Sequence, residues 1–122
     1  MILMGILRLT KSILTAVVLC VAPFAYAHAI VLSATPAQRE AVTGPDVPVK
    51  LRFNSRIDVK RSRLVLLTPD GEQRNLSVIE AGAGDSLKAE ATGLKSGSYV
   101  LRWQVLASDG HITRGELPFS VK

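Results

Sequence analysis

Two histidines and one aspartate are the side chains in this sequence best suited to binding a metal. Beyond residue 27 the chain has only two histidines, His28 and His111, and Asp109 stands two residues before His111. The spacer Gly110 allows the carboxylate and the imidazole to reach one ion from a turn. Imidazole nitrogens and a carboxylate oxygen suit copper(II) in a tetragonal geometry, and zinc, which prefers tetrahedral sites, is the main competitor.

His28 can offer its α-amine as a second metal-binding nitrogen only if the first 27 residues are removed. They have the parts of a secretory signal peptide: two basic residues, an apolar run over 13–21 and an A-x-A cleavage site at 25–27. The apolar run is shorter than the roughly 20 residues that span a bilayer, although an uncleaved anchor is the alternative. Cleavage after Ala27 would free the α-amine of His28 and direct the protein to the bacterial periplasm, although sequence alone also allows another secreted destination.

We therefore expect a metal site that forms at the start of the mature chain. The α-amine and Nδ1 of His28 chelate the ion, His111 adds a third nitrogen, and Asp109 adds an oxygen. This set predicts one copper(II) ion per chain, bound less tightly as the pH falls, because the amine and imidazoles must be neutral. Residues 28–122 contain no Cys and no Met, which excludes disulfides, thiolate-ligated zinc or iron–sulfur sites and a thioether copper(I) site.

Length and charge limit the remaining classes of protein. The chain has 122 residues and a net charge of +5, and residues 28–122 carry 13 basic and 10 acidic side chains. That length allows one domain. The mild positive charge gives no reason to expect nucleic acid as a partner. We expect residues 28–122 to form a single domain and a monomer.

Alternation of apolar and polar residues predicts the elements that must position these ligands. The pattern has a period of two nearly everywhere, and turn residues separate the segments, as at Asp70-Gly71. It predicts an all-β domain, a Greek-key sandwich or barrel of seven or more strands. The expected strands are residues 29–34, 47–53, 63–68, 73–80, 86–92, 98–107 and 117–121.

Two aromatic residues of the strand at 98–107 have specific expected roles. Tyr99 follows a Leu and a Gly at the start of the strand, as in a tyrosine corner, where the hydroxyl bonds back to the preceding loop; otherwise it is only a core aromatic. Trp103 alternates with the core face, so we expect it to anchor the core or to lie beneath the metal site.

A basic cluster over residues 60–63, with Arg56 nearby, has two interpretations. It is a solvated loop and strand start, as charge runs usually are. Alternatively, it attracts anionic lipid headgroups or an acidic partner.

The whole of residues 28–122 resembles the CopC family of periplasmic copper-resistance proteins. The segments that carry the resemblance are 28–37, 49–54, 94–103, 105–111 and 113–121. The resemblance implies a cupredoxin-like or immunoglobulin-like β-barrel. It also implies a copper(II) site formed by the N-terminal His28 together with Asp109 and His111.

Two departures from the family pattern refine this expectation. Members with a second, copper(I) site use Met-rich loops, so this chain resembles the branch with the copper(II) site alone. Many members also carry a Glu shortly after the Phe of the second strand, whereas here Asn54 and Ser55 follow Phe53. An accessory or axial role of that Glu must be filled by Asp109 or by water.

The expected function is therefore a copper(II) carrier or buffer in copper homeostasis and resistance, without enzymatic activity. The family implies an inner-membrane copper transporter as a partner. A histidine-brace copper oxygenase is the alternative enzyme, but an in-plane carboxylate would occupy the oxygen position and 95 residues leave little surface for a polymeric substrate. A metal-free immunoglobulin-like interaction module is the third possibility.

Overall fold

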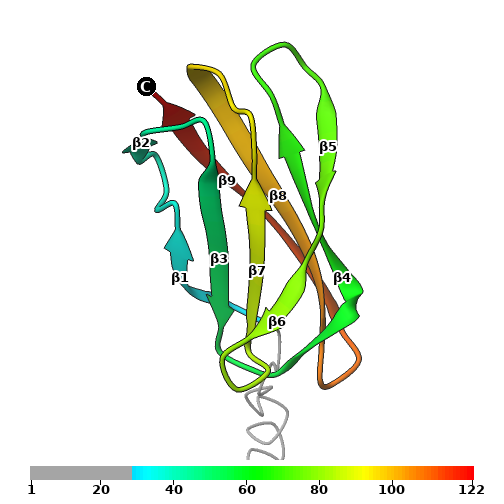
Figure 1. Cartoon of the computed structure of the whole chain (residues 1–122). Helices are drawn as coiled ribbons and strands as arrows, with labels where there is room; N and C mark the ends of the chain where they lie inside the picture. The colour runs from blue at the N-terminus through cyan, green and yellow to red at the C-terminus, as the bar shows by residue number, and fades with distance from the viewer. Residues whose placement is uncertain (1–28) are drawn as a thin grey trace, which may run out of the picture.

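The computed structural model of the protein describes residues 29–122, which form nine β-strands in two packed sheets (Figure 1). The four-stranded sheet has the order β1-β3-β7-β6 and the five-stranded sheet the order β2-β9-β8-β4-β5. The strands are β1 (Val31–Thr35), β2 (Ala41–Val42), β3 (Val47–Phe53), β4 (Ile57–Leu67), β5 (Gln73–Leu76), β6 (Ile79–Ala81), β7 (Ser86–Ala91), β8 (Gly97–Ala107) and β9 (Ile112–Val121).

This arrangement confirms the all-β prediction as a sandwich. Beyond β3 the chain changes sheets between β3 and β4, between β5 and β6 and between β7 and β8, as in Greek-key sandwiches. The described residues contain no helix, and hence none long and apolar enough to cross a membrane. The predicted signal peptide and His28 lie outside the described residues.

Three strand predictions differ clearly from the structure, and alternation does not predict β2. Strand β9 begins at Ile112, five residues before the predicted start at 117. The segment expected as one strand over 73–80 is two strands, because β5 pairs with β4 in one sheet and β6 pairs with β7 in the other. Strand β4 begins at Ile57, six residues before the predicted start at 63. Its register with β8 shifts between Asp58 and Arg63. The bulge breaks the period of two, so the sequence pattern does not reveal the first half of the strand.

The core lies between the sheets and follows the alternation directly. Every second residue of β3 is buried, as are the inward residues Leu64 and Leu66 of β4 and Leu101 and Val105 of β8. Burial of such aliphatic side chains is the main force that holds the two layers together.

Tyr99 forms the predicted tyrosine corner. Its hydroxyl donates a hydrogen bond to the carbonyl oxygen of Lys95 at 2.7 Å, and its ring stacks on Phe119 with centroids 5.5 Å apart. The corner fixes the loop that crosses from one sheet to the other before β8.

Trp103 lies at the inner side of β8 and is partly buried. Its indole meets the ring of Phe53 edge to face at 5.3 Å, which supports the role of core anchor. The indole also covers Gly115 on the neighbouring strand, where a Cβ atom would lie 2.3 Å from Trp103 Cζ2. Only a glycine therefore fits opposite this tryptophan.

The Asp70-Gly71 hairpin is also confirmed, between β4 and β5. Gly71 has a positive φ of 87° and donates its N–H to the carbonyl of Thr68 at 3.0 Å. The Thr68 hydroxyl donates to Asp70 Oδ1, and this hydrogen bond is the main cause that lowers the pKa of Asp70 below its ordinary value.

Candidate metal centre

The turn between β8 and β9 carries Asp109 and His111 and is closed by three backbone hydrogen bonds. The N–H of Ala107 bonds to the carbonyl of His111 at 2.9 Å, and that of Gly110 bonds to the carbonyl of Ala107 at 2.9 Å. Gly110 has a φ of 89°, which favours glycine at this position. The N–H of Ser108 bonds to the carbonyl of Arg56 at 3.0 Å, which ties the turn to the loop between β3 and β4.

The structure brings the two predicted ligands of the turn into direct contact. Asp109 Oδ1 accepts the backbone N–H of His111 at 3.0 Å, and Asp109 Oδ2 lies 2.9 Å from His111 Nδ1. An ionised carboxylate only accepts, so a hydrogen bond between these two atoms has His111 Nδ1–H as its donor. The side chains of His111 and Asp109 are 64% and 23% exposed, so the imidazole projects from the end of the sandwich.

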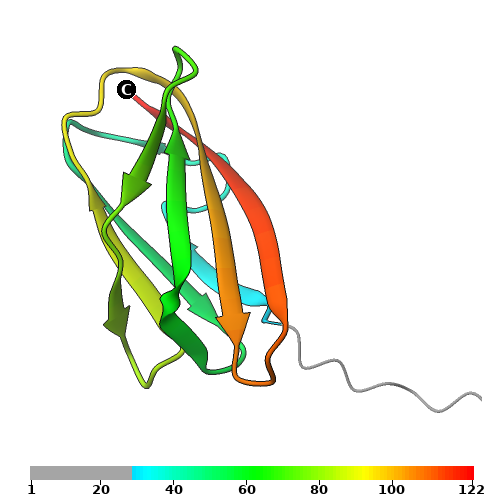
Figure 2. The ribbon, with the colours of Figure 1, turned by 90° about the vertical axis from the view of Figure 1, so that its right-hand side faces the viewer.

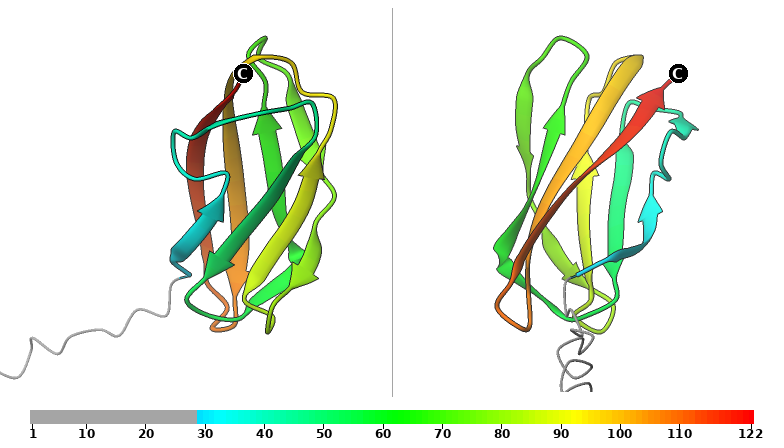
Figure 3. Two further views of the ribbon diagram at one scale, coloured as in Figure 1. Left: turned by 60° about the vertical axis from the view of Figure 1, so that its left-hand side comes forward. Right: turned by 180° about the vertical axis from the view of Figure 1, so that it is seen from behind.

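The segment that follows His28 is fixed at this same end of the sandwich. Ala29 is only 2% exposed, and the N–H of Ile30 donates to Asn54 Oδ1 at 2.8 Å. The backbone N–H of Asn54 donates in return to the carbonyl of Ile30 at 3.0 Å. Figure 3 shows the beginning of the described chain and the β8–β9 turn at one end of the molecule.

Residues 54–56 connect the two segments. Asn54 holds Ile30 on one side of this loop, and the carbonyl of Arg56 accepts from Ser108 on the other side. The backbone on each side of the candidate site is therefore fixed against one short loop. In the sequence, Asn54 stands out only as a departure from a family pattern. Its bond to Ile30 is a tertiary contact, which no local motif indicates.

Two buried hydroxyls adjoin these segments. Ser55 Oγ and Thr113 Oγ1 have no hydrogen-bond partner among residues 29–122. Ser55 belongs to the connecting loop and Thr113 follows His111 by two residues. Buried polar groups are normally satisfied, so this end of the sandwich suits a polar ligand or bound water.

The described part of the chain supplies two of the three predicted ligand residues. Within residues 29–122 no group of three His, Cys, Asp or Glu side chains could hold a metal ion. The pair Asp109 and His111 is in place, and His28 lies outside the described residues, one position before the buried Ala29.

Comparison with known proteins supports this fold over most of the chain. The family model of the CopC domain matches residues 31–122. Protein YobA of Escherichia coli K12 is 31% identical over 121 residues, covering 95% of this chain and 94% of YobA.

Two solved structures have the same architecture. CopC from Methylosinus trichosporium OB3b superposes with a TM-score of 0.68 and 30% identity, covering 78% of this chain and 94% of CopC. PcoC, a methionine-rich copper resistance protein from Escherichia coli, gives 0.65 and 25% identity, covering 79% of this chain and all of PcoC. Sequence and fold together therefore place the chain in the CopC family.

Proposed function

We propose that this protein binds one copper(II) ion in the periplasm and acts as a copper carrier or buffer. Its family includes copper resistance proteins, which supports a role in copper resistance. The observation that carries the proposal is the paired Asp109 and His111, held at the same end of the sandwich as the segment that follows His28.

The contact between Asp109 and His111 suits copper binding in a specific way. With Nδ1 bonded to Asp109, the imidazole would coordinate through Nε2, and the carboxylate fixes the orientation of the ring. Carboxylates that hold ligating histidines in this way raise ligand basicity and limit ring rotation. In this arrangement Asp109 lies across the ring from an ion bound at Nε2, so direct coordination by Asp109 requires the His111 ring to turn and release the hydrogen bond.

His28 completes the proposed site after cleavage at Ala27. Its α-amine and Nδ1 would chelate the ion, and Ala29 and Ile30 fix the backbone that follows. Three nitrogens and one oxygen favour copper(II) over zinc, because copper stands highest in the divalent affinity order and accepts a planar arrangement. The proposed activity is binding, with an inner-membrane copper transporter as partner and a monomer as the working state.

The first test asks whether the free amine is required. The protein is expressed from the full sequence, purified from the periplasm, and titrated with copper(II) under native mass spectrometry, beside a form with one extra alanine before His28. We expect cleavage after Ala27 and one copper per chain. The extra residue should weaken binding by more than about tenfold, which corresponds to 1.4 kcal/mol.

A chain with one extra alanine after Lys122 is the matched control, since it has the same added mass at the other terminus. It should bind copper as the unmodified protein does. Equal affinity for all three forms would show that the amine of His28 is not a ligand.

A further inference from the structure

The outer face of the five-stranded sheet is hollowed and rich in arginine. Figure 2 looks towards this sheet. The hollow has a volume of about 470 Å³ and extends over β5, β4, β8 and β9. The residues that line it are three arginines, three amides, one carboxylate, one valine, Gly115 and Trp103, so most of them can form hydrogen bonds through their side chains.

The strand register orders these side chains into two rows across the sheet. In the first row Arg63 of β4 lies opposite Gln104 of β8, which lies opposite Arg114 of β9. The second row runs from Asn75 through Val65 and Arg102 to Glu116. The two rows together carry three positive charges and one negative charge.

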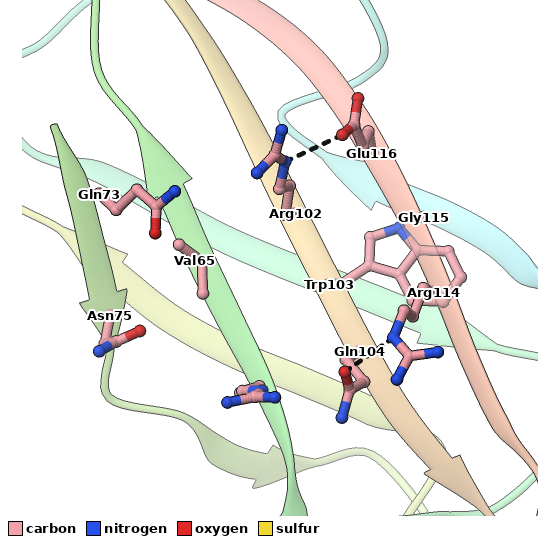
Figure 4. A pocket seen from close by; sticks show the side chains of 10 residues that line it. Val65, Gln73, Asn75, Arg102, Trp103, Gln104, Arg114, Gly115 and Glu116 are labelled. Carbon is pink, nitrogen blue, oxygen red and sulfur yellow. Dashed lines mark hydrogen bonds and ion pairs between the residues drawn. The ribbon is translucent and has the colours of Figure 1, made fainter. Parts of the chain in front are cut away.

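Two of the guanidinium groups are held in place by their neighbours (Figure 4). Arg102 Nε donates to Glu116 Oε1 at 2.9 Å, and Arg114 Nε donates to Gln104 Oε1 at 2.9 Å. Both bonds use Nε, so the terminal N–H groups of each arginine remain able to bind a carboxylate in two-pronged fashion. Fixing the side chains beforehand lowers the entropy that a ligand must overcome on binding.

The first row also fixes the distance between Arg63 and Arg114. Arg63 and Arg114 lie two strands apart, which is about 9.6 Å at the usual strand separation. A segment in the extended polyproline II conformation advances about 3.1 Å per residue with three residues per turn, so acidic side chains three positions apart lie on one face and match the two guanidinium groups. Gln104 lies between the two arginines, where its amide can bond to a peptide backbone.

We infer that this hollow binds an extended acidic segment of a partner protein that crosses the strands of the sheet. A protein segment fits better than a bilayer surface, because the arginines line a concavity and are interleaved with amides that suit a peptide backbone. Lys60 and Arg61 are exposed on the β4 bulge beside Arg63, so the basic cluster of the sequence extends the same surface. The inference is independent of copper binding.

The test uses the periplasmic protein without copper and a synthetic heptapeptide, Glu-Ser-Ser-Glu-Ser-Ser-Glu with blocked ends. Binding is followed by the amide chemical shifts of the ¹⁵N-labelled protein. We expect shifts confined to β4, β5, β8 and β9, weaker at higher salt. The double variant Arg63→Gln with Arg114→Gln should raise the Kd by at least about tenfold, through the loss of two charge-assisted contacts.

A double variant with the same change of net charge is the control. Arg52→Gln with Lys88→Gln lies on the four-stranded sheet and should leave the Kd within about twofold. The inference is overturned by equal binding of a peptide with Gln in place of Glu, or by an equal effect of both double variants. Free citrate binding as tightly as the peptide, or binding to phosphatidylglycerol vesicles without binding to the peptide, would likewise overturn it.

Discussion

Asp109 makes two hydrogen bonds to His111, and different substitutions remove one or both of them. Its Oδ1 caps the turn through the N–H of His111, whereas Oδ2 holds the imidazole. An asparagine keeps an oxygen for the cap but loses the negative charge, and an alanine loses both. The cap is a property of the structure, and the role of Asp109 as a copper ligand is the proposal.

We predict that Asp109→Asn weakens copper(II) binding by about 10- to 100-fold and changes the EPR parameters. His111→Ala should weaken binding further, because it leaves only the terminal chelate. Affinity is measured by competition with a chelator, and the spectra are recorded at equal copper loading.

Asp46→Asn is the matched control for both variants. Asp46 also accepts a backbone N–H, from Gly93 at 3.1 Å, but does so in loops away from the β8–β9 turn. It should leave copper binding unchanged. An unaltered spectrum and affinity in Asp109→Asn would remove Asp109 from the coordination sphere.

Asn54 acts on the site only through the backbone that it holds. Asn54→Ala removes the acceptor of the Ile30 N–H but keeps the backbone bond in the other direction. We predict a loss of about 1 kcal/mol in stability, faster hydrogen exchange at the Ile30 amide, and weaker copper binding. The variant Asn75→Ala, on the other sheet, should show none of these changes, and normal exchange at Ile30 in Asn54→Ala would contradict the clamp.

At the scale of the elements, the β8–β9 hairpin depends on the fit of Trp103 over Gly115. Gly115→Ala would place a methyl group 2.3 Å from the indole, so the ring must move from its contact with Phe53. We predict a destabilisation of about 1–3 kcal/mol, as overpacking usually gives, and a changed near-ultraviolet circular dichroism spectrum of the single Trp.

A double-mutant cycle checks the cause of that loss. In a Trp103→Leu background the added methyl group has room, so Gly115→Ala should cost much less there. An equal cost in both backgrounds would show that the indole is not what excludes a side chain at position 115.

Alternation and turn residues predict most of the strands. They do not predict features that depend on contacts between distant parts of the chain. Asp70-Gly71 and Tyr99 have local signatures, and the hairpin and the tyrosine corner follow from them. Only Ser77 and Val78 lie between β5 and β6, with no glycine or proline to mark the change of sheet. The bulge in β4 is stabilised by the Ser62 hydroxyl, which donates to the Asp58 carbonyl at 2.6 Å, and such a contact is not readable from spacing.

The candidate site was predictable to a similar degree. Spacing singles out the pair Asp109 and His111, and the structure places their side chains in contact, while their binding of copper stays a prediction. Asn54 and the arginine rows need the register between strands, which a sequence does not specify before the fold is known.

At the scale of the whole molecule, composition predicts a preference between copper oxidation states. Residues 28–122 have neither Cys nor Met, and soft copper(I) prefers sulfur ligands. We predict that the protein does not compete with bathocuproine for copper(I) while it retains one tight copper(II) ion. Retention of copper(I) against that chelator would contradict a site of nitrogen and oxygen donors alone.

The parallel pairing of β2 with β9 determines when this chain can finish folding. Ala41 lies beside Ser120, and Arg39 donates its N–H to the Pro118 carbonyl, so an early segment is completed only by the last residues. Contacts between such distant parts of a chain slow folding, because the loop between them must close first. A ribosome-bound chain that lacks β9 should therefore stay open, and the sandwich is completed only after β9 has been synthesised.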